Sequence, residues 1–151
     1  MMILYRIAKC NYADDLSGTG ARLYGGRWNS EGRPMLYLAS SRALAVLEVL
    51  VHLNPLIIPS NFCLATIEVP DTDIVLLDTA LLPNNWQDVS APAILKQLGD
   101  AFLKKQERLL MRVPSAVVPE EYNYLLNPLH LNVKDVRVIT KEPFSFDDRL
   151  L

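Results

Sequence analysis

The chain has 151 residues, of which 50% are hydrophobic and 21% are charged, and its formal net charge is -2 at pH 7. This length and composition predict one globular domain over residues 1–151 and exclude an intrinsically disordered chain. The acidic balance and the lack of any Lys/Arg run argue against direct binding of nucleic acid, because a phosphate backbone needs a basic surface.

We expect neither a membrane-spanning segment nor an export signal in this sequence. Arg6 introduces a charge too early for the apolar core of a signal peptide. No apolar stretch approaches the roughly 18 residues of a membrane span. We therefore expect a cytoplasmic protein that makes no contact with a membrane.

The cysteines and histidines suggest neither a cross-link nor a metal site. Cys10 and Cys63 lack the C-x-x-C spacing of redox and metal sites and the density of a secreted disulfide scaffold, so we expect both to be reduced. His52 and His130 lie near no cysteine and form no H-E-x-x-H pattern. A bound metal is therefore not expected.

Two short strands flank a long glycine-rich segment in the first part of the chain. Hydrophobic alternation predicts strands over residues 2–8 and 36–38. Between them, residues 17–34, called here the glycine-rich segment, hold five of the six glycines together with Tyr24 and Trp28. A loop of this length inside a compact domain is usually functional, and its large aromatic side chains favour that interpretation.

Residues 42–53 form the first predicted helix. Ser40 and Ser41 can cap its start, and Asn54-Pro55 ends it. Apolar residues occupy nearly every side, so we expect this helix to be buried. A second, amphipathic helix is predicted over residues 91–105, with Gly99 weakening its middle.

The remaining apolar segments predict strands, and strands dominate the chain. They cover residues 62–69, 74–77, 109–113, 116–118, 124–126 and 136–140. Several links between them are too short for the crossover that parallel strands need. The sequence therefore predicts an α+β fold with mixed, mainly antiparallel sheets and flanking helices.

Glu48 lies in the middle of the predicted buried helix. An ionised carboxylate there is costly unless it is paired, so we expect a cationic group beside it. Two interpretations stay open: a structural or solvent-facing acid, and a functional carboxylate next to the glycine-rich segment. His52, one turn later, is predicted to be an interior histidine.

The glycine-rich segment could contact phosphate in two ways. Gly18-Thr19-Gly20 lacks the third glycine and the helix–strand unit of a dinucleotide-binding fold, which excludes that assignment. The alternative is an arginine-bearing flap, because guanidinium groups make bidentate contacts with phosphate. Arg6 and Arg27 are the candidates, and a surface charge is the competing interpretation for each.

Tyr37 and Ser115 each have a structural and a functional interpretation. Tyr37 lies in an aliphatic strand, where its ring either fills the core or borders a site. Ser115 lies between two hydrophobic segments without a G-x-S-x-G motif or a supporting His/Asp pair. We therefore predict a turn or hydrogen-bonding role for Ser115 rather than a nucleophile.

Arg27, Glu48 and Ser115 match the Arg-Glu-Ser set from which the RES domain takes its name. Ordered blocks of sequence surround them at residues 4–7, 20–29, 36–40, 45–48, 112–119, 123–130 and 146–150. On these blocks the sequence resembles the RES-domain toxins of Xre-RES type II toxin–antitoxin systems over essentially the whole chain.

The resemblance implies a fold similar to ADP-ribosyltransferases of the diphtheria-toxin type, which bind NAD in a cleft between two small sheets. It implies NAD as substrate and no metal. Catalytic roles would fall to Arg27, Tyr37, Glu48 and Ser115, and NAD contacts to Arg6, Arg27, Trp28, Tyr37 and Asn127. The chain departs from those enzymes where Ser115 stands in place of a late catalytic glutamate.

The activity implied by the resemblance is toxic cleavage of the nicotinamide–ribose bond of NAD, by hydrolysis or phosphorolysis. One alternative is mono-ADP-ribosylation of a host metabolic enzyme such as phosphoribosyl-pyrophosphate synthetase. Another is a non-catalytic binding module in which Glu48 and the arginines only hold the loop. The implied partner is a helical Xre-like antitoxin that covers the cleft near Arg27 and Glu48, and a homodimer or a larger toxin–antitoxin complex is compatible with the sequence.

Overall fold

A seven-stranded sheet and three α-helices make up the computed structural model, which describes residues 1–57 and 59–151. In chain order the elements are β1 (Met2–Lys9), α1 (Thr19–Tyr24), β2 (Leu36–Ala39), α2 (Arg42–Leu50), β3 (Phe62–Val69), β4 (Ile74–Leu76), η1 (Thr79–Leu81), α3 (Ala93–Lys105), β5 (Leu110–Pro114), β6 (Tyr122–Leu126), η2 (Leu131–Asp135), β7 (Arg137–Phe144) and η3 (Asp148–Leu150). No helix in the described part of the chain is long and apolar enough to cross a membrane.

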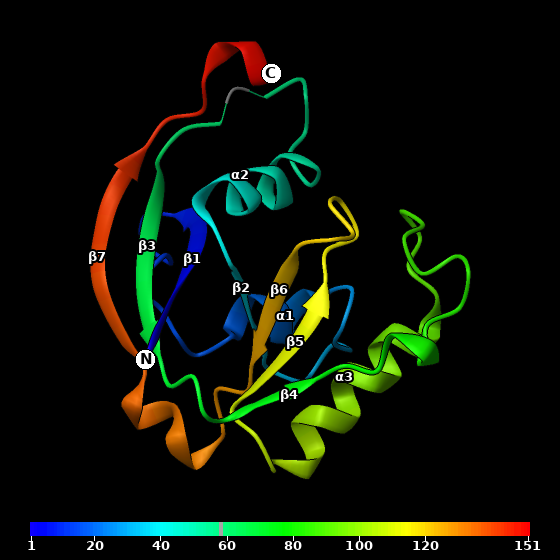
Figure 1. The fold of residues 1–151 in the computed structure, drawn as a ribbon. Helices are drawn as coiled ribbons and strands as arrows, with labels where there is room; N and C mark the ends of the chain where they lie inside the picture. Colours follow the sequence, from blue (N-terminus) through cyan, green and yellow to red (C-terminus); the bar gives the residue numbers. More distant parts are fainter. Residues whose placement is uncertain (58) are drawn as a thin grey trace.

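The sheet consists of two wings that meet at a narrow junction. The strand order is β4-β5-β6-β2-β1-β3-β7, and only β4 and β5 pair in parallel. This confirms the predicted mixed, mainly antiparallel α+β class. β1 pairs with β3 along its length but meets β2 only at Tyr5 and Ala39. The four-stranded wing (β4, β5, β6, β2) therefore diverges from the three-stranded wing (β1, β3, β7), with α2 across one end (Figure 1).

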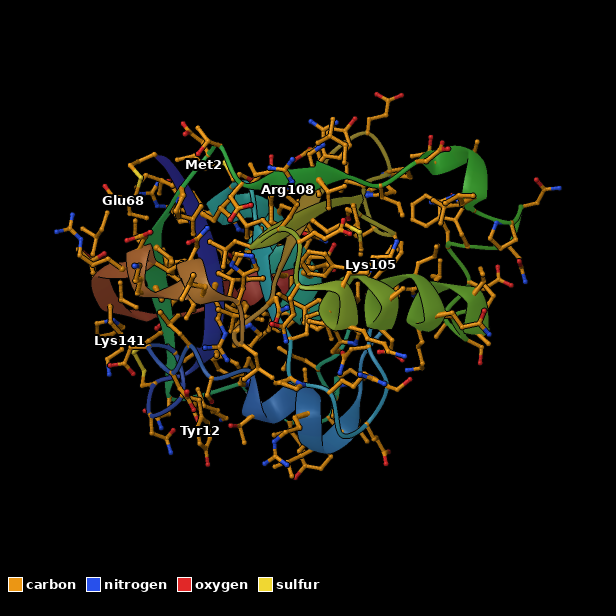
Figure 2. The ribbon with its side chains drawn as sticks, turned by 90° about the horizontal axis from the view of Figure 1, so that it is seen from below. Met2, Tyr12, Glu68, Lys105, Arg108 and Lys141 are labelled. Carbon is orange, nitrogen blue, oxygen red and sulfur yellow. A yellow bond between two sulfur atoms is a disulfide. The ribbon has the colours of Figure 1, made fainter. Side chains whose placement is uncertain are left out.

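The three-stranded wing has a buried centre and a polar edge. β3 carries a nearly continuous apolar run, in which Ala65, Ile67 and Val69 have no exposed surface. β7 lies at the sheet edge and extends to Phe144, past the predicted residues 136–140, because β3 supplies pairing partners along it. Figure 2 shows this wing, with Met2, Glu68 and Lys141 labelled, on one side of the molecule and α3, ending at Lys105, on the other. The proline and charges of β7 discourage further strand pairing at this edge.

Helix α3 packs against the four-stranded wing and touches the glycine-rich segment. Its buried residues Leu95, Phe102 and Leu103 join one apolar cluster with Trp28 and with side chains of β5 and β6. A Cβ atom on Gly99 would lie 1.7 Å from the Trp28 carbonyl oxygen. Gly99, predicted only to weaken the helix, is therefore the point at which the helix and the segment come into contact.

The Gly99→Ala substitution is expected to lower the free energy of unfolding by about 1–3 kcal/mol or more, since the added methyl group overlaps backbone. Gly20→Ala is the matched control because a Cβ atom at Gly20 meets nothing within 4 Å. Helix propensity favours alanine there by about 1 kcal/mol. Urea unfolding of both variants measures the difference, and equal stability of the two would rule out the tight contact at Gly99.

Helix α2 is capped as predicted but is less buried than predicted. The Ser41 side chain accepts a hydrogen bond from the Leu44 amide at 3.1 Å, and the helix ends at Leu50, before the predicted end at residue 53. Only Leu44 and Ala45 are buried in it. The expectation of a buried helix was wrong because α2 turns part of its apolar surface toward a cavity rather than toward packed core. His52, expected inside the protein, is exposed just beyond the helix.

Two other local predictions were wrong. The glycine-rich segment is not loop throughout, because it contains α1, whose first turn follows Gly18 in the left-handed conformation with φ of 72°. Residues 116–118 do not form a strand. The Ser115 hydroxyl accepts hydrogen bonds from the Val117 and Val118 amides at 3.1 and 3.0 Å, which closes a turn in place of strand pairing.

Cys10 and Cys63 form a disulfide, contrary to the expectation of two reduced thiols. The antiparallel register places Ala8 opposite Cys63, so the chain that leaves β1 brings the Cys10 Cα within 4.7 Å of the Cys63 Cα. The cysteines are separated by 53 residues in sequence, and only the pairing of β1 with β3 makes them neighbours. The bond therefore fastens one end of the three-stranded wing.

Removal of this cross-link in Cys10→Ser is expected to lower the free energy of unfolding by about 2–4 kcal/mol under oxidising conditions. Stability falls because the unfolded chain gains conformational entropy when the disulfide no longer closes a loop. Denaturant titrations with and without a reducing agent provide the check, and the variant should be insensitive to the reductant. Identical midpoints for oxidised and reduced wild-type protein would contradict this contribution.

Candidate active site

A cavity of about 550 Å³ opens where the two wings of the sheet meet. Its volume falls in the range of small-molecule sites. The wall combines strands β1 and β2, the inner side of α2 and the glycine-rich segment. The polar and aromatic side chains in this wall are Tyr5, Arg6, Tyr24, Arg27, Trp28, Tyr37, Glu48, His52 and Asn123. Residues far apart in the sequence therefore share one hollow.

Glu48 projects from α2 and is held by two neutral donors. Its Oε1 accepts hydrogen bonds from Ser115 Oγ at 2.6 Å and from Asn123 Nδ2 at 2.9 Å. The expected cationic partner was therefore wrong, and a hydroxyl and an amide take its place. The described residues provide no hydrogen bond to the second oxygen, Oε2, of this cavity-lining side chain. The acid is fixed in position while one oxygen remains available.

Ser115 is a buried support for Glu48. Its side chain has no exposed surface, and it is not among the residues that line the cavity. The hydroxyl accepts from the Val117 and Val118 amides, so its single proton is directed to Glu48. This arrangement agrees with the predicted hydrogen-bonding role and leaves no lone pair for nucleophilic attack.

Arg27 lies at the cavity with its guanidinium braced by backbone. Nη1 donates to the Trp86 carbonyl and Nη2 to the Asp88 carbonyl, both at 3.0 Å. Carbonyl oxygens carry no net charge, so these contacts orient the guanidinium without neutralising it. The remaining donors can therefore meet an anion.

Arg6 enters the same cavity from β1 and also supports the chain that follows this strand. Its Nη1 donates to the carbonyl oxygens of Tyr12, Ala13 and Asp15 at 2.8, 3.3 and 2.9 Å. Burial lowers the pKa of Arg6, while the charge of Asp15 raises it. Arg6 therefore combines a structural role with a positive charge beside the hollow.

Tyr37 joins the cavity wall to the glycine-rich segment. Its hydroxyl donates to Asn29 Oδ1 and accepts from the Trp28 amide at 3.1 Å. Burial raises the pKa of Tyr37, so the phenol keeps its proton at neutral pH. A Cβ atom on Gly26 would lie 2.5 Å from this hydroxyl, and glycine is therefore required for the close approach.

Helix α3 fixes the part of the segment that carries Arg27. Lys96 Nζ donates to the Gly26 and Asn29 carbonyls, and Asp100 accepts from the Ser30 amide at 2.9 Å and from its hydroxyl at 2.6 Å. Asn29 is completely buried, and its Nδ2 donates back to the segment. Sequence reasoning missed these supports because surface-type residues on a helix carry no motif.

Trp28 and Asn127 contribute less to the cavity than expected. Trp28 borders it, but only 3% of this residue is exposed and it packs in the cluster under α3. Asn127 is not among the lining residues, and its amide donates to the Leu103 carbonyl at 3.2 Å and accepts from the Leu129 amide at 3.0 Å. The expected contact between Asn127 and NAD is therefore not supported, because both ends of its amide hold the chain after β6.

Asn123 is the site residue that sequence reasoning missed. It lies on β6 opposite Ala39 of β2, and this register turns its side chain toward Glu48. A polar residue next to strand-forming aromatics was the only signal available. Its role becomes visible once the pairing of β6 with β2 is known.

Comparison with known proteins identifies the family to which this chain belongs. The sequence model of the RES domain matches residues 3–147. The chain belongs to the RES domain family. In this RES chain the three name-giving residues converge, because Ser115 holds Glu48 and Arg27 lies in the same cavity wall as Glu48.

Curated relatives of the RES chain are similar over nearly their whole length. A protein named Toxin Res from Pseudomonas putida is 44% identical over 99% of both chains. A Toxin Res from Photorhabdus laumondii is 39% identical over 99% of this chain and 97% of the relative. A protein of Sphingobium sp. named Prs ADP-ribosylating toxin is 41% identical over 95% of this chain and 91% of the relative.

A solved structure shares the fold of the RES chain. It is the MbcT–MbcA toxin–antitoxin complex of M. tuberculosis, and the TM-score is 0.78 over 95% of this chain and 84% of that chain. The sequences are 22% identical, a level at which the likeness shows the fold alone.

Proposed function

We propose that this RES-domain protein is a toxin that binds NAD in the cavity between the two wings and breaks the bond joining nicotinamide to ribose. The observation that carries the proposal is the convergence of Arg27, Tyr37 and Glu48, with Arg6, around one nucleotide-sized hollow. Family membership and relatives named as toxins support it.

The chemistry suits a site with one fixed acid and two guanidinium groups. When the glycosidic bond breaks, its electron pair passes to the pyridinium nitrogen, and nicotinamide leaves as a neutral molecule. The ribose becomes oxocarbenium-like, and Glu48 faces that developing positive charge. Arg27 and Arg6 bind the diphosphate, and the Tyr37 ring packs beside nicotinamide. Addition of water then yields ADP-ribose and a proton, whereas addition of phosphate yields phosphorylated ADP-ribose.

A second candidate reaction transfers the ADP-ribosyl group to a protein. The name of the Sphingobium relative, Prs ADP-ribosylating toxin, favours it. Bond breaking is the same, but the acceptor becomes a side chain of a host enzyme such as phosphoribosyl-pyrophosphate synthetase. The two reactions therefore differ in the product that carries ADP-ribose.

The partner we propose is a helical Xre-like antitoxin. The structural neighbour is part of a toxin–antitoxin complex, which supports a protein partner of this kind. An antitoxin segment laid across the mouth of the cavity would block access to Arg27 and Glu48. DNA contact would then belong to the antitoxin, in keeping with the acidic balance of this chain.

Incubation of the purified protein with NAD, with and without phosphate and a host-cell extract, tests these proposals. We expect one nicotinamide released per ADP-ribosyl product, and mass spectrometry identifies water, phosphate or protein as the acceptor. Lys104→Ala, on the exposed end of α3, is a control with wild-type activity. A folded protein that neither binds NAD in calorimetry nor releases nicotinamide would support the non-catalytic alternative instead.

Ser115→Ala is expected to lower kcat by about ten- to hundredfold, since a hydrogen bond to a charged group contributes about 1.5–3 kcal/mol. The affinity for NAD should change little, because Ser115 acts through Glu48 and does not line the cavity. Steady-state kinetics and calorimetry separate the two quantities. Complete loss of turnover in a folded variant would point to a nucleophilic serine and contradict this role.

A further inference from the structure

The side-chain amide of Asn123 uses its NH₂ group in a hydrogen bond, but its oxygen has no hydrogen-bond partner among the described residues. Nδ2 donates to Glu48 Oε1 at 2.9 Å. Oδ1 is buried and has no hydrogen-bond partner, and it is the single buried side-chain atom of this kind in the part of the chain that the structure describes. Asn123 also lines the cavity. A residue of the cavity wall therefore carries an unsatisfied acceptor, which is buried just beneath the surface of the cavity.

The orientation of this amide follows from its neighbours. Ser115 Oγ accepts two backbone hydrogen bonds, so its proton must go to Glu48 Oε1. That oxygen is consequently an acceptor, and Asn123 must present its NH₂ group to it. Rotation of the amide by 180° would place two acceptor oxygens against each other. Oδ1 is therefore the amide atom that has no hydrogen-bond partner within the described fold.

Burial of an acceptor without a partner is unfavourable, and such groups are rare in folded proteins. Asn123 lines the cavity, so a small rotation of its side chain would bring Oδ1 to the cavity surface, where a donor of the entering molecule would satisfy it. A site built in this way also discriminates against a molecule that lacks the donor. Asn123 Oδ1 thus has the properties of a substrate contact.

We propose that Asn123 accepts a hydrogen bond from a hydroxyl of the nicotinamide-side ribose of NAD, beside the contact that Glu48 makes with the same sugar. This assignment rests on the proposed function. Asn123 and Glu48 are joined through Oε1, and each side chain keeps one oxygen, Oδ1 and Oε2, that no described residue satisfies, so the pair offers two acceptors to the two neighbouring ribose hydroxyls. Asn123 would bind the sugar with Oδ1 and hold the acid with Nδ2.

Substrate analogues separate the two roles of the amide. We expect Asn123→Leu, which is similar in size, to lower kcat/KM for NAD by about tenfold or more. The loss of kcat/KM that arises from poorer positioning of Glu48 should appear with every substrate. The loss of kcat/KM that arises from the missing Oδ1 contact should disappear with an analogue from which the contacted hydroxyl of the nicotinamide-side ribose has been removed.

The experiment measures kcat/KM of wild-type protein, Asn123→Leu and Asn123→Ala with NAD, with the two monodeoxy analogues of that ribose, and with 3-acetylpyridine adenine dinucleotide, which lacks the carboxamide N–H. Asn11→Ala, an exposed amide in the loop after β1, is the matched control. Thermal unfolding verifies that each variant folds, and Asn123→Ala replaces Asn123→Leu if the latter does not.

The proposal predicts that the penalty for changing Asn123 falls with one deoxy analogue and persists with the acetylpyridine analogue. An equal penalty with all substrates would overturn the contact and leave only a positioning role. A penalty that falls with the acetylpyridine analogue would overturn the ribose assignment in favour of the carboxamide. Absence of turnover by wild-type protein with NAD would instead refute the proposed function, so the two failures are distinguishable.

Discussion

Glu48→Gln is expected to slow the release of nicotinamide by on the order of hundredfold or more, because the negative charge facing the developing ribose cation is lost. Glutamine has nearly the same shape, and its oxygen can still accept from Ser115 and Asn123, so the fold and the cavity should persist. The affinity for NAD should change by much less than the rate. Single-turnover kinetics with excess enzyme measure the chemical step directly.

Glu107→Gln is the matched control for this prediction. Glu107 is exposed in the turn after α3 and is not among the residues that line the cavity. Its substitution removes the same charge from the protein without touching the site, and the rate should stay at the wild-type value. A Glu48→Gln protein that releases nicotinamide at the wild-type rate would exclude an electrostatic role for this acid.

Arg27→Ala is expected to weaken NAD binding by about ten- to hundredfold, since a charge-assisted hydrogen bond contributes about 1.5–3 kcal/mol. The change also removes the brace between the glycine-rich segment and residues 86–88. Arg27→Lys should restore little of the affinity, because an ammonium group cannot reproduce two donors in a fixed planar arrangement. Isothermal titration calorimetry with NAD measures both variants.

Arg22→Ala tests whether any arginine of the segment would have the same effect. Arg22 is exposed on α1 and is not among the cavity-lining residues, so its loss should leave NAD affinity unchanged. If Arg27→Ala binds NAD as tightly as wild-type protein, the guanidinium does not contact the diphosphate. If Arg22→Ala weakens NAD binding to the same extent, Arg27 contributes to the affinity through long-range electrostatics rather than through direct contact with NAD.

Sequence periodicity predicted the elements whose burial follows a simple pattern. The type and spacing of side chains predicted the apolar strand β3 and the serine cap at the start of α2. The two structural predictions were correct because each depended on local chemistry. Arg27 and Glu48 were named as site residues by the family resemblance, and the structure places them in one cavity wall.

The predictions that failed depended on pairing between distant segments. The disulfide needs the β1–β3 register, which brings Cys10 next to Cys63. The neutral partners of Glu48 come from the turn after β5 and from β6, and no local rule connects them with α2. The burial of α2 was overestimated because an apolar side chain facing a cavity has the same sequence signature as one facing packed core.

The narrow junction of the sheet explains why the site lies where it does. β1 and β2 are joined at one residue pair, so their neighbouring backbones separate and leave room that α2 and the glycine-rich segment only partly fill. The acid is supplied from the α2 side and the arginine from the segment. A substrate that spans the opening would contact both, which would tie the proposed reaction to this feature of the fold.

A crystal structure of the Glu48→Gln protein with NAD tests the central claim most directly, because slow turnover should preserve the substrate. We predict that the nicotinamide–ribose bond lies between Tyr37 and residue 48, with the diphosphate against the Arg27 guanidinium. NAD bound outside this cavity, or a cavity that stays empty at saturating NAD while the protein still releases nicotinamide, would contradict the account.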